Sequence, residues 1–376
     1  MKDLRANALL SLVMGLGLAV GVFRGPVVAQ PAPAVTDSIG AALAEEHPGG
    51  AVIGLLHDSD TSVRSFGAVD STGTAPTART LFEIGSITKT FTGLLLAERI
   101  EQEQLRPETP VTRLLPDSVT VTRADSVGDT PMTLAHLATH RSGLPRLPTN
   151  LKDVMASRQD PYAAYGDSVL YAFLDDYTLP RTPGATYQYS NLGMGLLGHL
   201  LARRADTTYG ALVRRRITGP LGLSDTRLRL TDDQEERFAQ GDRLGFRVPP
   251  WHFEALAGAG ALRSTAADML AYLQVHRRAL RADPDTASAL GRAMQRPLAP
   301  RASAGSDDTR VGFGWHETTR DGHRIVVHTG GTGGFKSIAL LDRAAGHGAV
   351  ILVNASLGHE RVAEAGFALI EALRPD

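Results

Sequence analysis

Segments with the composition of β-strands lie near both ends of this 376-residue chain, and the middle of the chain reads mostly as helix. Near the start, strands are predicted at residues 51–57 and 62–69, joined by a polar Asp-Ser-Asp turn. Near the end, strands are predicted at 311–317, 324–328, 335–341 and 349–354. This distribution predicts a two-lobed α+β fold. One antiparallel sheet is built from both chain ends, and a mostly helical lobe is inserted at about residues 90–295.

Helices are predicted beside this sheet and throughout the insertion. An amphipathic helix at about 36–46 and a helix at about 360–373 flank the strands at the two chain ends. Inside the insertion, helices are predicted at 134–139, 162–177, 191–204, 209–217 and 266–280. Residues 297–310 are polar and rich in Pro, Ser, Gly and Asp, which predicts a mobile loop.

The first 29 residues have the composition of a secretory signal peptide. Lys2 and Arg5 precede an uncharged apolar segment at 6–23, and Val27-Val28-Ala29 offers small residues for cleavage before Gln30. The alternative is an uncleaved anchor, although the apolar segment is short for a membrane span. We therefore expect an exported protein, periplasmic or secreted, with a linker at 30–35, one domain at 36–376 and no stable membrane span after cleavage.

Composition excludes several classes of function. The formal net charge is −1, so no overall field selects nucleic acid or an anionic membrane. The run Arg214-Arg215-Arg216 is interpreted as a solvated helix face. Because the chain has no cysteine, disulfides, thiolate metal sites and a cysteine nucleophile are excluded. No His-Glu-x-x-His motif occurs, and neither a metal nor a cofactor is predicted.

The end of a strand, a turn at Gly85 and the start of a helix are predicted at residues 82–91. The sequence there is Phe-Glu-Ile-Gly-Ser-Ile-Thr-Lys-Thr-Phe. Lys89 is the lone charge in an otherwise apolar or hydroxylated helix segment, so desolvation should lower its pKa. Ser86 lies three residues earlier on the same face, in a first turn whose free N–H groups favour negative charge. A hydroxyl beside such an amine is activated as a nucleophile. The alternative is a surface lysine that follows a serine cap.

Two further stretches place polar side chains at strand and helix ends. Tyr189-Ser190-Asn191 lies between a Pro-Gly turn and a predicted helix, where the alternative is a buried aromatic followed by a helix cap. His328-Thr329-Gly330 leaves a predicted strand and enters a glycine-rich turn that exposes backbone N–H groups. The alternative here is a flexible hairpin with a surface histidine.

Together, Ser86-x-x-Lys89, Tyr189-Ser190-Asn191 and His328-Thr329-Gly330 resemble the three active-site boxes of serine β-lactamases and penicillin-binding proteins. The tyrosine resembles the class C pattern, which related D,D-carboxypeptidases, D-amino-acid peptidases and esterases share. Residues 137–145 and 259–269 also resemble stretches of this family. The resemblance implies a β-lactamase/transpeptidase-like catalytic domain over residues 36–376, without a cofactor.

The resemblance also implies residue roles. Ser86 would be the acylated nucleophile, Lys89 and Tyr189 the proton-transfer pair, and the N–H groups of Ser86 and Gly331 the oxyanion hole. Asn191 would hold Lys89 and the substrate amide. The remaining substrate-binding residues would be His328, Thr329, Gly330 and, near the substrate carboxylate, Arg361.

Two departures bear on the substrate. His328 replaces the lysine of most class C enzymes, which predicts a carboxylate-binding field that is weaker or that titrates near pH 6.5. Leu147 stands where those enzymes place an amide side chain, with Asn150 as the closest substitute. We expect a serine hydrolase that forms an acyl-enzyme on a small-molecule or peptide substrate, best matched by a class C-type β-lactamase. The alternatives are a D-alanyl-D-alanine carboxypeptidase or D-amino-acid peptidase, a carboxylesterase, and a non-catalytic penicillin- or peptidoglycan-binding sensor.

Other enzyme classes fit less well. The chain has no Gly-x-Ser-x-Gly motif, which disfavours an α/β-hydrolase. Gly193, Gly195 and Gly198 match a dinucleotide-binding fingerprint, but they follow a polar loop rather than an apolar strand. These glycines are interpreted as positions of close helix packing.

Overall fold

The computed structural model describes residues 33–46, 49–125, 128–283 and 287–374. Its centre is an eight-stranded antiparallel sheet with the order β2-β1-β14-β13-β12-β11-β10-β9. The strands are β1 Ala51–His57, β2 Asp60–Phe66, β9 Ala302–Ser306, β10 Thr309–Val311, β11 His316–Arg320, β12 His323–Gly331, β13 Lys336–Asp342 and β14 Gly348–Val353. Because β1 pairs with β14, the two ends of the chain form one sheet, as predicted.

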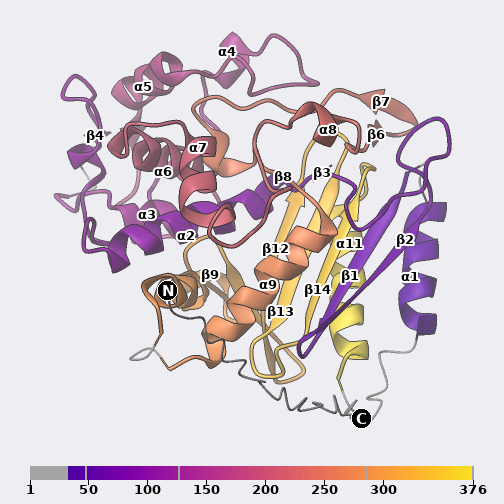
Figure 1. Ribbon diagram of the computed structural model, residues 1–376. Helices are drawn as coiled ribbons and strands as arrows, with labels where there is room; N and C mark the ends of the chain where they lie inside the picture. Colours follow the sequence, from indigo (N-terminus) through magenta and orange to yellow (C-terminus); the bar gives the residue numbers. More distant parts are fainter. Residues whose placement is uncertain (1–32, 47–48, 126–127, 284–286, 375–376) are drawn as a thin grey trace, which may run out of the picture.

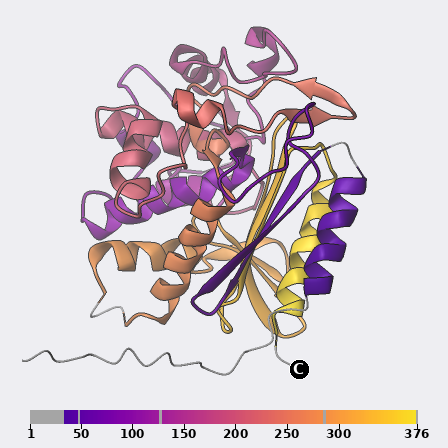
Figure 2. The same cartoon turned by 45° about the vertical axis from the view of Figure 1, so that its right-hand side comes forward.

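Helices cover both faces of this sheet. Helices α1 and α11 lie side by side on one face, and α9 crosses the other face in front of β1, β13 and β14 (Figures 1 and 2). The other helices form a lobe beside the sheet. The helices are α1 Pro33–Glu45, α2 Thr88–Glu101, α3 Leu134–Ala138, α4 Leu151–Val154, α5 Asp167–Asp176, α6 Asn191–Arg204, α7 Tyr209–Val213, α8 Asp232–Glu235, α9 Ala266–Arg281, α10 Ala289–Gln295 and α11 His359–Ala372.

Three short pairs of strands lie outside the main sheet: β3 Phe82–Glu83 with β8 Arg263–Ser264, β4 Thr122–Arg123 with β5 Thr178–Leu179, and β6 Gly241–Arg243 with β7 Phe246–Val248. The pairing of β3 with β8 matters for the site, because it fixes the strand that leads into Ser86. The strand whose end is predicted just before Gly85 is therefore present, but it is only two residues long.

The central strands are buried on both faces because each face has its own helical cover. In β1, Val52 joins the core shared with the helical lobe, and the next residue, Ile53, joins the core beneath α1 and α11. In β14, Leu352 and Ile351 divide between the two cores in the same way. Successive side chains of a strand point to opposite faces of the sheet, so neighbouring residues enter different cores although both faces are apolar.

Several predicted boundaries are wrong. The predicted linker ends too late, because α1 already starts at Pro33, where a proline suits the first helical turn. The helix predicted at 162–177 starts at Asp167, since Tyr162 instead stacks on Phe253. The predicted loop at 297–310 contains strands β9 and β10. Their polar composition fits an exposed edge of the sheet.

Two of the three glycines of α6, Gly195 and Gly198, pack closely against the segment 256–258. A Cβ at Gly195 would lie 2.6 Å from Leu256, and one at Gly198 would lie 2.8 Å from the Cα atom of Gly258. The interpretation of these glycines as close packing positions agrees with this contact.

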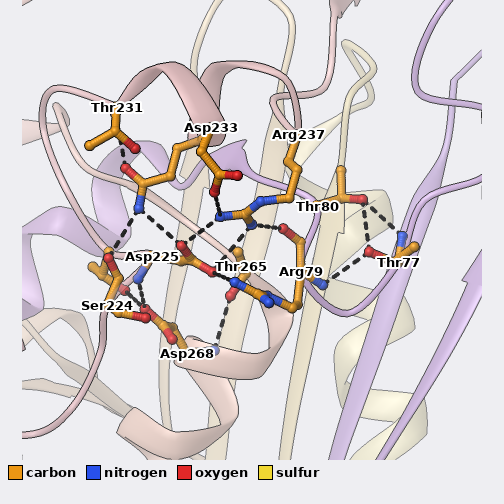
Figure 3. A network of polar contacts seen from close by, with 12 residues as sticks. Thr77, Arg79, Thr80, Ser224, Asp225, Thr231, Asp233, Arg237, Thr265 and Asp268 are labelled. Atoms are coloured by element: carbon orange, nitrogen blue, oxygen red, sulfur yellow. Dashed lines mark hydrogen bonds and ion pairs between the residues drawn. The ribbon is translucent and has the colours of Figure 1, made fainter.

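Hydrogen bonds and ion pairs of Asp225 connect Arg79, which precedes β3, with Asp268 in the first turn of α9. The Asp225 carboxylate lies 2.8 Å from a guanidinium nitrogen of Arg237 and 3.5 Å from one of Arg79. Figure 3 shows Asp225 between these two arginines. The Asp225 N–H in turn donates to Asp268, whose own N–H is capped by Thr265. The network therefore ties three chain segments together a few residues before β3, the strand that leads into the site.

Among the residues that the structure describes, no helix is long and apolar enough to cross a membrane. The predicted signal segment lies outside the described residues.

A buried histidine predicts how stability should depend on pH. His276 on α9 is fully buried, and burial lowers its pKa to about 3. It stays neutral in the folded protein, whereas the unfolded chain takes up a proton below about pH 6.5, so acidification should destabilise the fold. Between pH 7.5 and 5, His276→Phe should lose about 2 kcal/mol less unfolding free energy than the wild type. Urea unfolding at both pH values measures this difference, and equal losses would contradict it.

Candidate active site

Ser86 and Lys89 lie where a short 3-10 helix, Gly85–Ile87, leads directly into α2. The Lys89 Nζ atom lies 2.9 Å from Ser86 Oγ and 2.5 Å from the backbone carbonyl oxygen of Ala259. Among the described residues, Lys89 forms no ion pair, and its side chain is fully buried. Burial, and secondarily the charge of Arg146, lowers the Lys89 pKa well below its ordinary value. The predicted desolvation of this lysine is therefore present.

Lys89 is buried because α2 is enclosed by protein from Thr88 to Arg99. A Cβ at Gly93 would lie 2.0 Å from the carbonyl oxygen of Phe313, so the backbone of another segment lies directly against the helix. The surrounding lobe thus excludes water from Lys89 and leaves the amine two polar neighbours, Ser86 and Ala259.

Tyr189 lies beside both Ser86 and Lys89. Its side chain interacts with Ser86, and the Lys89 Nζ atom lies 5.1 Å from the centre of the tyrosine ring. Burial raises the Tyr189 pKa to about 12, although the interaction with Ser86 and the charge of Arg146 act in the other direction. Tyr189 therefore keeps its proton at neutral pH and can donate it.

Asn191 is the first residue of α6 and lies close to the site. Ser190 caps this helix by accepting a hydrogen bond from Gly193, as predicted from its position. The Oδ1 atom of Asn191 is buried without a hydrogen-bond partner in the protein. The hydrogen bonds of Lys89 go to Ser86 and Ala259 rather than to Asn191, so the predicted contact between Asn191 and Lys89 is not formed in this structure.

The third box lies on the last residues of β12, which continues to Gly331 before its turn. A Cβ at Gly85 would lie 2.5 Å from the Gly331 backbone nitrogen, and Gly85 has φ of +48°. Only glycine combines this backbone angle with so close an approach. The turn that carries Ser86 therefore lies against the strand end that carries Gly331, as an oxyanion hole from their two N–H groups requires.

His328 is buried, not a surface histidine. Its Nδ1 atom donates to the Thr329 carbonyl oxygen over 2.6 Å, and its Nε2 atom is buried without a partner. Burial first, then His316 and Lys89, lowers the His328 pKa well below 6.5. The expectation of a field that titrates near pH 6.5 is therefore wrong, since a neutral imidazole is favoured there.

Further histidines and a tyrosine behind Tyr189 were missed by the sequence reasoning. The His140 ring lies 4.5 Å from the Tyr189 ring, centre to centre, and its Nδ1 accepts the Ser190 N–H over 3.1 Å. His140 has φ of +57°, a conformation that non-glycine residues adopt rarely and that often marks functional sites. His316 lies between His140 and His328 and bonds to Tyr187. The position of His140 in the 137–145 stretch was the available signal.

Basic side chains surround Gly331. A Cβ at Gly331 would lie 2.9 Å from Lys336 Nζ and 3.1 Å from His359 Nε2, so both groups face this glycine. Arg146 lies 5.0 Å from the centre of the Tyr189 ring. Neither Arg146 nor Lys336 forms an ion pair within the described ranges. These residues were also missed, although Lys336 is one of only four lysines in the chain.

Arg361 is not brought to the site. Its guanidinium pairs with Glu46 at the end of α1, and the Nε–Oε1 distance is 2.8 Å. Asn150, the predicted amide substitute, is also engaged, since it donates to the Val169 carbonyl oxygen and accepts from Tyr165.

A group of side chains with metal-ligand spacing lies at the other end of the sheet. Within the described part of the chain, His57, Asp58 and His347 form the one group with ligand-like spacing. His57 ends β1 and His347 precedes β14, whereas Gly331 and Lys336 pair at the opposite strand ends.

Comparisons with known proteins agree with this geometry. The chain is 27% identical to the D-alanyl-D-alanine-carboxypeptidase/endopeptidase AmpH of Escherichia coli (strain K12), over 82% of this chain and 80% of that protein. It is 27% identical to a Beta-lactamase of the same organism, over 60% of this chain and 55% of that protein. It is 28% identical to the Unguisins hydrolase ungD of Aspergillus violaceofuscus (strain CBS 115571), over 82% and 58% respectively. The profile of the family described as Beta-lactamase matches residues 35–374. Since that match spans most of the chain, the protein belongs to the β-lactamase family, within the superfamily of serine β-lactamases and penicillin-binding proteins, and is a serine hydrolase by that membership.

Proposed function

We propose that the protein hydrolyses the amide bond before a C-terminal D-amino acid, as a D-alanyl-D-alanine carboxypeptidase does, through an acyl-enzyme on Ser86. The observation that carries this proposal is that Ser86 lies beside both Lys89 and Tyr189, two groups whose pKa values burial moves in opposite directions. Such a pair supplies both a base and an acid at neutral pH.

The roles follow from these pKa shifts. Neutral Lys89 accepts the Ser86 proton as Oγ attacks the substrate carbonyl, and the N–H groups of Ser86 and Gly331 stabilise the oxyanion. Protonated Tyr189 donates to the leaving nitrogen as the C–N bond breaks, and the Lys89 ammonium returns a proton toward Tyr189. Water then attacks the ester of Ser86, with the same groups acting in reverse, and releases the shortened peptide.

The basic groups near Gly331 support a substrate that ends in a carboxylate. Lys336 and His359 face Gly331, and Arg146 lies over Tyr189. Because His328 is neutral and Arg361 is paired with Glu46, we assign the carboxylate to Lys336, with Arg146 and His359 nearby. The similarity to AmpH, whose name describes a D-alanyl-D-alanine-carboxypeptidase, points the same way.

The second candidate is a class C-type β-lactamase, favoured by the Tyr189-Ser190-Asn191 box. β-Lactam amides need the same nucleophile and oxyanion hole. The side chain of Asn150, the predicted substitute for that amide, argues against this candidate, because both of its polar atoms are already engaged in hydrogen bonds. The similarity to proteins named Beta-lactamase, which in one case extends over 86% of this chain, also supports this candidate.

We also propose that residues 1–29 direct export, to the periplasm or the medium. This proposal rests on the basic start, the uncharged apolar segment and the small residues before Gln30. The N-terminal residue of the protein recovered from secreting cells would be Gln30.

Ser86→Ala should lower kcat by about 10⁴-fold or more, because the bond-forming oxygen is lost. The panel for wild type and variant is a D-Ala-D-Ala peptide, a chromogenic cephalosporin, a p-nitrophenyl ester and a labelled penicillin. Faster turnover of the peptide than of the cephalosporin supports the carboxypeptidase, and the reverse supports the β-lactamase. Turnover of the ester alone supports an esterase, and a persistent penicillin label without turnover supports a sensor. Unchanged activity of a folded Ser86→Ala variant would contradict the nucleophile assignment.

The pH profile of kcat/KM should rise with increasing pH through the lowered pKa of Lys89 and then stay level to pH 10. Lys89 must lose its proton to act as a base, and Tyr189, with a pKa of about 12, keeps its proton over that range. Lys89→Arg should be inactive at every pH, because arginine does not deprotonate in proteins. Initial rates from pH 5 to 10 measure the profile. A decline between pH 8 and 10, or an active Lys89→Arg variant, would contradict these roles.

Lys336→Met should raise KM for a peptide with a free C-terminal carboxylate by about tenfold, because a charge-assisted hydrogen bond is lost. A p-nitrophenyl ester without a carboxylate should be hydrolysed as before. The matched control is Lys152→Met, at an exposed lysine on α4. An equal change in KM for both substrates, or no change for the peptide, would contradict the assignment of Lys336 to the substrate carboxylate.

A further inference from the structure

A polar cavity lies at the C-terminal ends of α2 and α6, whose N-terminal ends carry residues of the candidate active site. It has a volume of about 260 Å³ and is lined by Arg99, Arg204, Arg215 and Arg216, with Leu105 and Leu201 among its apolar walls. Arg99 is in the last turn of α2 and Arg204 in the last turn of α6. The starts of the same helices hold Lys89 and Asn191, so the cavity is separated from the active site by the length of these helices.

The positive charge of this cavity is only partly compensated. Glu98 lies 3.2 Å from the Arg99 guanidinium and 3.6 Å from that of Arg216. Arg204 and Arg215 form no ion pair among the residues that the structure describes. Four arginines against one glutamate leave three positive charges, since 4 − 1 = 3. An anion in the cavity would lower this repulsion.

Arg99 has an unused donor although it is almost fully buried. Its exposed fraction is 7%, and its Nη1 atom donates to Gln104 over 2.7 Å. Its Nη2 atom is buried without a hydrogen-bond partner in the protein, as is the Nε atom of Arg216. A buried charged donor without a partner is costly, so a ligand that accepts from it would bind with a gain.

The backbone presents the arginine run to two different cavities. Residues Arg214–Thr218 form a π-helix, closed by a bond from the Gly219 N–H to the Arg214 carbonyl oxygen. Arg215 and Arg216 line the cavity described above, whereas Arg214 lines a separate one beside Leu228. Arg214 and Arg215 are exposed, in agreement with the interpretation of this run as a solvated helix face, whereas Arg216 is half-buried and pairs with Glu98. Single π-helical turns recur at functional sites.

Helix dipoles explain only part of this cluster. Cations are favoured at helix C-termini, which accounts for Arg99 and Arg204. Arg215 and Arg216 come from another segment and add charge beyond what those two ends require.

We propose that this cavity binds a phosphate-class dianion, either inorganic phosphate or a phosphate monoester. The planar guanidinium fork matches two phosphate oxygens at once, and a dianion compensates more of the three surplus charges than a carboxylate does. A cavity of about 260 Å³ has room for the tetrahedral group and a small attached alcohol. The site is separate from the catalytic machinery.

Isothermal titration of the whole protein with inorganic phosphate and with glycerol phosphate, at constant ionic strength, tests this proposal. We expect saturable binding of one anion. The double variant Arg204→Gln/Arg215→Gln should raise Kd by about tenfold or more, because two charged donors are lost. The control Arg203→Gln/Arg214→Gln removes the same charge from neighbouring residues that line other cavities, and its Kd should stay within about twofold of wild type.

Tighter binding of glycerol phosphate identifies a monoester as the ligand class, and tighter binding of inorganic phosphate identifies the free ion. Either result supports the proposal. No saturable heat in the wild type, or equal weakening in both double variants, would overturn it. Hydrolysis of the p-nitrophenyl ester should be unchanged in all variants, which shows that they fold and separates this test from that of the active site.

Discussion

The burial of Lys89 is the constraint on which the chemistry of this protein depends. An ammonium group without a carboxylate partner is costly inside a protein, and here the cost is reduced because the amine is favoured in its neutral form. That form is the one that can accept a proton from Ser86. The same dry surroundings raise the pKa of Tyr189, so one physical cause provides both a base and an acid around a single hydroxyl.

The site forms only because the sheet joins the two ends of the chain. Ser86 follows β3 near the start, and Gly331 ends β12, 245 residues later (331 − 86). The pairing of β1 with β14 sets the position of β12 and β13, and the contact of Gly85 with Gly331 sets the distance between Ser86 and the end of β12. Ser337 strengthens this contact by donating to the Ile84 carbonyl oxygen over 2.9 Å.

Charge around the site is arranged differently from what the family pattern suggests. Burial beside His316 and Lys89 lowers the pKa of His328 and favours its neutral form. Arg361 forms an ion pair with Glu46. Lys336 instead faces Gly331, and Arg146 lies over the Tyr189 ring, although these two cations are far apart in the sequence. The arginine cavity shows the same principle at the other ends of α2 and α6, where residues from three segments combine their charges.

The sequence alone determined the elements whose cause is local. Short stretches of sequence predicted the burial of a lone lysine in an apolar helix, the Ser190 cap of α6 and the strands at both ends that form one sheet. They also singled out Ser86, Lys89 and Tyr189 as candidate site residues. The pairing of Arg361 with Glu46, the burial of His328, the approach of His140 to Tyr189 and the gathering of four arginines were decided by the tertiary structure. Each depends on the distance between segments remote in the sequence. Desolvation and charge interactions act through space, and no window of sequence contains that distance.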